Sequence, residues 1–144
     1  MKKAIDTPNA FEGIPSVEEV EEKLRSHFEK IISFCKEGGE GESFYSVEII
    51  LKELLSQFGC LCFQLFLMSF SQGLDVKKWS DDGLYYAKKT PIGRSIKTVY
   101  GEVRYWRTYL VRKGPSGGGF FPMDTVLGIT RDGFSPSVIS LCTR

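Results

Sequence analysis

The feature that most limits how this chain can fold is an apolar run of 13 residues, Phe58 to Phe70, which holds one amide side chain, Gln64, and no charge. A helix that spans a bilayer takes about 20 such residues, so this run is too short. It continues a helical stripe of apolar side chains at three- and four-residue spacing: Val47, Ile50, Leu51, Leu54 and Leu55. We therefore expect one helix from about Ser46 to Gln72, with its second half the most buried segment.

A second, amphipathic helix is expected to precede it. Ser16-Val17-Glu18-Glu19 is a capping box, in which the serine hydroxyl and the Glu19 carboxylate satisfy free backbone amides. One apolar stripe follows: Val17, Val20, Leu24, Phe28, Ile31, Ile32 and Cys35. An acidic linker, Gly38 to Glu42, separates the two helices. We expect residues 1–15 to be a flexible lead-in and 16–73 a helical subdomain, whose stripe packs within the chain or against a second chain.

The formal charge is divided between the two halves. Residues 1–72 carry 7 basic and 12 acidic side chains, and residues 73–144 carry 12 basic and 6 acidic ones. Such asymmetry is typical of a surface for a polyanion, although basic residues also cover solvated strands. The candidate nucleic-acid-binding residues are Lys88, Lys89, Arg94, Lys97, Arg104, Arg107, Arg112 and Lys113.

These basic residues fall in a predicted set of antiparallel strands. Gly101-Glu102 suits a two-residue type II′ turn, with Ile96–Tyr100 and Val103–Val111 as the paired strands. On the returning strand, alternation places Val103, Tyr105, Arg107, Tyr109 and Val111 on one face, and Arg104, Trp106, Thr108, Leu110 and Arg112 on the other.

Shorter elements are expected on either side of this hairpin. Asp81-Asp82-Gly83 predicts a turn before a short strand at 84–87. A third strand is expected to return at Phe120-Phe121 and to end at Pro122, followed by a turn through Asp124 to Gly128. Ser135-Pro136 begins a short last helix. We expect 74–144 to be a basic β-hairpin subdomain and the fold class to be α+β: two amphipathic or buried helices, a small antiparallel β-meander and a C-terminal helix.

The sequence offers little for catalysis. Its one histidine, His27, lies on a charged helix far from any candidate nucleophile, and the glycines at 117–119 lack the frame of a phosphate-binding loop. The four cysteines lack the paired spacing of a zinc site and suit reduced thiols in a cytoplasmic protein. The N-terminus shows no secretory h-region. We expect no enzyme activity, no metal, no cofactor and no small-molecule substrate.

A series of short motifs runs through the C-terminal third. Thr98-Val99-Tyr100-Gly101-Glu102-Val103 is followed by Phe121-Pro122-Met123-Asp124, Leu127-Gly128-Ile129 and Phe134-Ser135-Pro136. In this order and spacing the segment resembles the N-terminal region of bacterial insertion-sequence transposases of the DDE type, in particular the Kra and Lre groups. The resemblance implies DNA binding in which phosphates are contacted by Arg104, Arg107, Arg112, Lys113 and the upstream lysines.

The chain departs from these transposases in two ways. Gly114 to Gly119 stands where many Kra-type members carry a cysteine pair, so no bound zinc is implied. The family's RNase H-like catalytic domain lies further downstream, so the resemblance implies a truncated, non-catalytic module.

The leading hypothesis is thus a cytoplasmic DNA-binding module that dimerises through its helices and has no contact with a membrane. Tyr105, Trp106 and Tyr109 would stack on bases or pack in the core. The alternative is a protein-interaction module that acts through the amphipathic helices and binds no nucleic acid. The third hypothesis is that the chain is a translated relic that has no selected activity.

Overall fold

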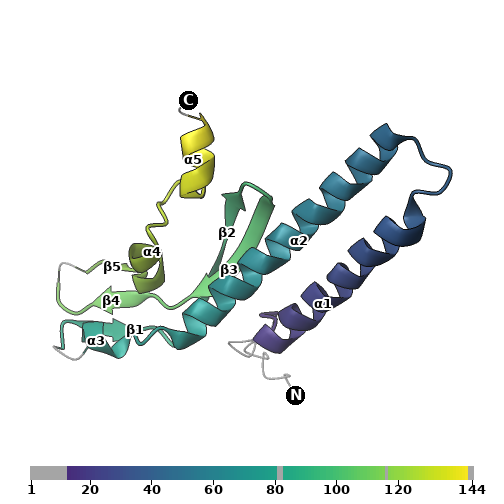
Figure 1. Ribbon diagram of the computed structural model, residues 1–144. Helices are drawn as coiled ribbons and strands as arrows, with labels where there is room; N and C mark the ends of the chain where they lie inside the picture. Colours follow the sequence, from purple (N-terminus) through teal and green to yellow (C-terminus); the bar gives the residue numbers. More distant parts are fainter. Residues whose placement is uncertain (1–12, 81–82, 116, 143–144) are drawn as a thin grey trace, which may run out of the picture.

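The structure is a computed structural model that describes residues 13–80, 83–115 and 117–142. It has the α+β architecture expected: two long helices, then a small antiparallel sheet region, then a short helix (Figure 1). The expected turn at Asp81-Asp82 and most of the expected lead-in, residues 1–12, lie outside the described residues.

Local capping signals set where the two long helices begin. In α1 (Val17–Ser33), the Ser16 hydroxyl accepts a 3.0 Å hydrogen bond from the Glu19 amide, as the capping box predicts. A π-helical turn, η1 (Phe34–Gly38), ends this helix at the glycine-rich linker. The second helix, α2 (Phe44–Gly73), begins two residues earlier than expected, because the Ser43 hydroxyl accepts from the Ser46 amide at 3.1 Å.

The two helices form an antiparallel pair whose connecting end extends beyond the sheet (Figure 1). His27 of α1 is buried, and its Nε2–H donates a 2.8 Å hydrogen bond to the Leu54 carbonyl of α2. The His27 and Phe28 rings both lie against Phe58. The apolar stripe of α1 therefore packs within the chain, and His27 serves this contact.

The second half of α2 is less buried than its composition predicts. Among its described residues only Gly59, Leu67 and Met68 are buried, and Phe66 is 52% exposed. By length and composition α2 could cross a membrane, and 17% of its apolar window is buried, but one such helix is weak evidence. Its second half packs against a strand.

The β-hairpin forms where the basic sequence predicts it, with its turn two residues earlier. Strands β2 (Ile92–Thr98) and β3 (Gly101–Arg107) pair from Thr98↔Gly101 to Ile92↔Arg107. The expected Gly101-Glu102 loop is therefore wrong: the turn is Val99-Tyr100, and the Thr98 hydroxyl closes it by donating to the Gly101 carbonyl at 2.8 Å. A shift of two residues keeps each side chain on its predicted face.

The returning strand does not run unbroken to Val111, as we expected. Pro91 precedes β2, so β3 loses its partner strand at Arg107, and the chain leaves the ladder at Thr108 and Tyr109. It then forms β4 (Leu110–Arg112), which pairs with β1 (Tyr85–Ala87) and β5 (Gly119–Phe120) in a separate sheet of order β1-β4-β5. A four-residue helix, α3 (Lys77–Ser80), precedes β1 and had no sequence signal.

The expected turn from Asp124 to Gly128 is a helix, α4 (Pro122–Leu127). Pro122 occupies a first-turn position, where its missing N–H costs nothing, and Gly128 ends the helix with a φ of 71°. The last helix, α5 (Pro136–Cys142), begins after Ser135 as expected, with the Val138 amide donating to the Ser135 hydroxyl at 3.3 Å.

One hydrophobic core joins the helical and the basic halves. It contains Leu67 from α2, Ile96, Val103 and Tyr105 from the hairpin, and Met123 from α4. The hairpin and α4 are therefore held on α2, and this contact fixes which hairpin face is open to solvent.

Candidate nucleic-acid interface

The hairpin register divides the predicted basic residues between two faces. Arg94 pairs with Tyr105, and Arg107 pairs with Ile92, so both arginines share the face of the buried Ile96 and Val103. Lys97 and Arg104 alternate with these residues and lie on the opposite face, here called the outer face.

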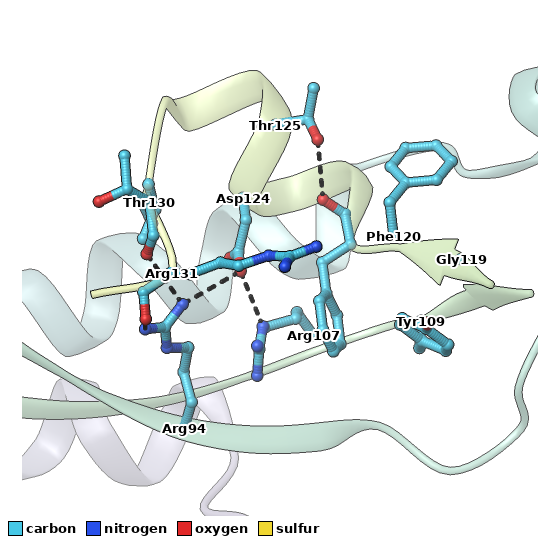
Figure 2. Close-up of a pocket in the computed structure, with 11 residues that line it drawn as sticks. Arg94, Arg107, Tyr109, Gly119, Phe120, Asp124, Thr125, Thr130 and Arg131 are labelled. Atoms are coloured by element: carbon cyan, nitrogen blue, oxygen red, sulfur yellow. Dashed lines mark hydrogen bonds and ion pairs between the residues drawn. The ribbon is translucent and has the colours of Figure 1, made fainter. Parts of the chain in front are cut away.

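Arg94 and Arg107 converge on one carboxylate (Figure 2). Asp124 Oδ2 accepts from Arg107 Nε at 3.2 Å and from Arg94 Nη1 at 3.5 Å, while Oδ1 accepts from the Tyr105 hydroxyl at 2.7 Å. Burial raises the pKa of the Tyr105 phenol well above its ordinary value, and the hydrogen bond to Asp124 raises it further. The phenol therefore stays protonated and donates. These four side chains are the Asp124 cluster.

The cluster removes two arginines from the predicted docking surface. The Arg107 side chain is 7% exposed, donates to the Ile92 carbonyl at 3.1 Å and lies 3.6 Å from the Phe121 ring centroid. The Arg94 side chain is 18% exposed and donates to the Thr130 and Arg131 carbonyls. Both guanidinium groups hold the fold together and lie on the inner side of the hairpin, so neither belongs to an open docking surface.

The outer face of the hairpin keeps its basic character. Lys97 and Arg104 are exposed, and the Arg104 guanidinium lies 5.5 Å from the Trp106 ring centroid. Gly93, opposite Trp106, leaves the room that this indole occupies, since a Cβ there would lie 2.7 Å from Nε1. Glu102 is the one acidic side chain of this face, and it pairs in register with Lys97 without a recorded ion pair.

The remaining predicted residues lie in loops and at strand ends. Lys88 and Lys89 are exposed between β1 and β2, and Arg112 and Lys113 are exposed at the end of β4. With Lys97 and Arg104 they make six basic side chains, here called the cationic set. Within the described residues, no member of the cationic set has a carboxylate within ion-pair distance.

The three aromatic residues weighed for base stacking differ in exposure. Tyr105 is fully buried in the core and cannot stack on a base. Tyr109 is partly buried and lies against Phe121, with a centroid distance of 4.7 Å. Trp106 is partly exposed beside Arg104, so it alone of the three combines a cationic neighbour with a place on the outer face.

Sequence reasoning missed the part played by Asp124 and Arg131. The sequence predicts a turn at Asp124, although this is the only acid between Glu102 and Asp132 and it follows the apolar run Phe120 to Met123. An isolated acid in an apolar segment within a basic region is the signal that could have shown a buried ion pair. Arg131 lies in the loop after α4 and lines the same pocket as the cluster.

Metal chemistry finds no support in the described ranges. No group of three or more histidine, cysteine, aspartate or glutamate side chains there could hold a metal ion. His27 is engaged with Leu54 and Phe58, away from the hairpin.

With the site described, the chain can be compared with known proteins. No protein-family model, no curated protein and no solved structure matches it.

Proposed function

We propose that the chain is a non-catalytic, cytoplasmic nucleic-acid-binding module that docks on phosphates through the cationic set. One observation carries the proposal: six exposed basic side chains without carboxylate partners lie in 83–115, where Glu102 is the only acidic residue. Unpaired surface cations raise the local potential and attract a polyanion. The resemblance to transposase N-terminal regions favours DNA over RNA as the polyanion.

The mode of binding follows from the side chains involved. Lysine and arginine contacts to phosphates fix position without reading sequence. Trp106, beside Arg104, adds a surface on which one base of a single strand could stack. We therefore expect the affinity for nucleic acid to depend strongly on salt concentration and little on the nucleotide sequence.

A salt series tests this mode. If all six residues contact phosphates, log K for duplex DNA should fall with log salt at a slope of about −5. Fluorescence anisotropy with a labelled duplex measures this slope, and an affinity unchanged by salt would exclude a phosphate-led mode.

Charge-matched variants locate the surface. Lys97→Ala with Arg104→Ala should reduce the magnitude of the slope by about 2, because two phosphate contacts are lost. Lys23→Ala with Lys30→Ala removes the same charge from exposed positions of α1 and should leave the slope unchanged. Equal effects of the two pairs would show that net charge, and not this surface, controls binding.

A second candidate function is association with another copy of the chain through the helices. The described helices expose large apolar side chains: Phe28, Phe44, Tyr45, Ile49, Leu55 and Phe66. Phe44 and Tyr45 are 78% and 72% exposed. Exposed apolar patches mark interaction sites. Glu48 and Lys52 lie one helical turn apart, beside Ile49, and have opposite charges. If two copies of α2 pack antiparallel about a two-fold axis, Glu48 of each copy would lie opposite Lys52 of the other.

Sedimentation analysis over a concentration series tests this association. The wild-type chain should sediment as a dimer, and Leu55→Lys should shift it to a monomer because a charge would enter the apolar contact. Gln57→Lys, on the polar side of α2, should leave the dimer intact. A wild-type chain that stays monomeric at the highest concentration would contradict the dimer.

A further inference from the structure

The Asp124 cluster forms the wall of a pocket on the side of the hairpin away from the outer face. The pocket has a volume of about 540 Å³, within the range of small-molecule sites. Arg94, Arg107 and Asp124 line it together with three aromatic residues, Tyr109, Phe120 and Phe121, here called the aromatic wall. Figure 2 shows the Arg131 side chain extending across the cluster from the loop after α4.

The buried charges in this wall do not balance. Two guanidinium groups share one carboxylate, and the Arg94, Arg107 and Asp124 side chains are 18%, 7% and 12% exposed. An uncompensated charge in a desolvated site is costly unless a counter-charge reaches it. Arg131 adds a third guanidinium at the rim. The pocket therefore has a place for an anion.

Hydrogen-bond donors for that anion are available. Arg107 uses Nε and Nη1, and within the described residues its Nη2 has no recorded partner. The Arg131 side chain is exposed and likewise has no recorded partner, since only its backbone carbonyl is bonded, to Arg94. One nitrogen of Arg107 and the Arg131 guanidinium, which line the same cavity, suit the oxygens of a phosphate group.

The aromatic wall indicates what the phosphate is attached to. Phe120 packs edge-on against Tyr85 at 5.3 Å, and Tyr109 lies against Phe121 at 4.7 Å, so neighbouring rings hold both in place. Fixed aromatic rings next to arginines offer a planar heterocycle a stacking surface.

We propose that this pocket binds the phosphate group of a nucleotide, with Arg131 and Arg107 on the phosphate oxygens and the base against the Tyr109 and Phe120 side. The phosphate can come from a free mononucleotide or from the phosphorylated end of a strand, which present the same chemistry. The pocket does not use the cationic set, so this proposal stands or falls independently of the docking proposed for that set.

Calorimetric titration of the full chain tests the pocket with three probes: 2′-deoxyadenosine 5′-monophosphate, 2′-deoxyadenosine and inorganic phosphate. The mononucleotide should bind at least about tenfold more tightly than either part, because only it engages both walls. Arg131→Gln should weaken mononucleotide binding about tenfold, since a charged hydrogen bond is lost. Arg25→Gln removes the same charge from an exposed position on α1 and should have no effect.

Short oligonucleotides with and without a 5′-phosphate distinguish the two sources. Tighter binding of the phosphorylated strand than of the mononucleotide, lost with Arg131→Gln, identifies a strand end; equal or weaker binding identifies a free nucleotide. The proposal is overturned if the mononucleotide binds no better than inorganic phosphate, or if Arg131→Gln and Arg25→Gln behave alike. Lys97→Ala with Arg104→Ala should leave mononucleotide binding intact, so the pocket and the cationic set are tested separately.

Discussion

Asp124→Asn is expected to lower the free energy of unfolding by about 3–5 kcal/mol, the cost of leaving a buried charge without its partner. The Asp124 carboxylate forms ion pairs with two largely buried guanidinium groups, and it also accepts a hydrogen bond from the Tyr105 hydroxyl. Asparagine keeps the size of the side chain but removes the charge, so the loss reports electrostatics and not a cavity. Urea unfolding followed by circular dichroism measures the change.

A matched control and a double-mutant cycle make this result specific. Glu102→Gln changes the same charge at an exposed site with no recorded ion pair and should alter stability by less than about 0.5 kcal/mol. In an Arg107→Met background one guanidinium is gone, so Asp124→Asn should cost clearly less than in the wild type. If Asp124→Asn costs no more than Glu102→Gln, the cluster does not stabilise the fold.

The elements that were predictable from the sequence are those with local signals. The Ser16 N-cap, the glycine linker after residue 38 and the Ser135-Pro136 helix start act within a few residues of themselves, and all three appear in the structure. The end of β3 at Arg107 depends instead on where β2 begins, on the far side of the turn. The helix at Pro122 was missed because proline also ends strands, and only packing of Met123 in the core decides between the two outcomes.

The sequence shows which basic residues belong to the candidate site, but not which of them form ion pairs. Strand alternation correctly separated Arg107 from Arg104, because a period of two is a local property. Which face is buried depends on α2 and α4, and the neutralisation of Arg107 depends on an acid 17 residues later. Charge counting treats every arginine as solvent-exposed, so it overstates a basic surface wherever a single carboxylate is buried beneath it.

The contact between α2 and the hairpin turn depends on a glycine in mid-helix. Gly59 is buried, and a Cβ there would lie 2.7 Å from Tyr100 Cδ1 and closer still to Cγ and Cδ2. Tyr100 also lies against Phe63, at a centroid distance of 6.0 Å, so its ring cannot move without losing that contact. Gly59→Ala should therefore destabilise the fold by about 2 kcal/mol, although alanine alone would favour the helix by about 1 kcal/mol.

Removing the opposing ring should reverse the sign of this effect. In a Tyr100→Ala background the three ring carbons nearest to position 59 are gone, and Gly59→Ala should then be neutral or stabilise the chain by up to about 1 kcal/mol. Urea unfolding of the four proteins in the cycle measures both values. If Gly59→Ala stabilises the wild-type chain as much as it stabilises the Tyr100→Ala chain, the hairpin turn does not pack on α2.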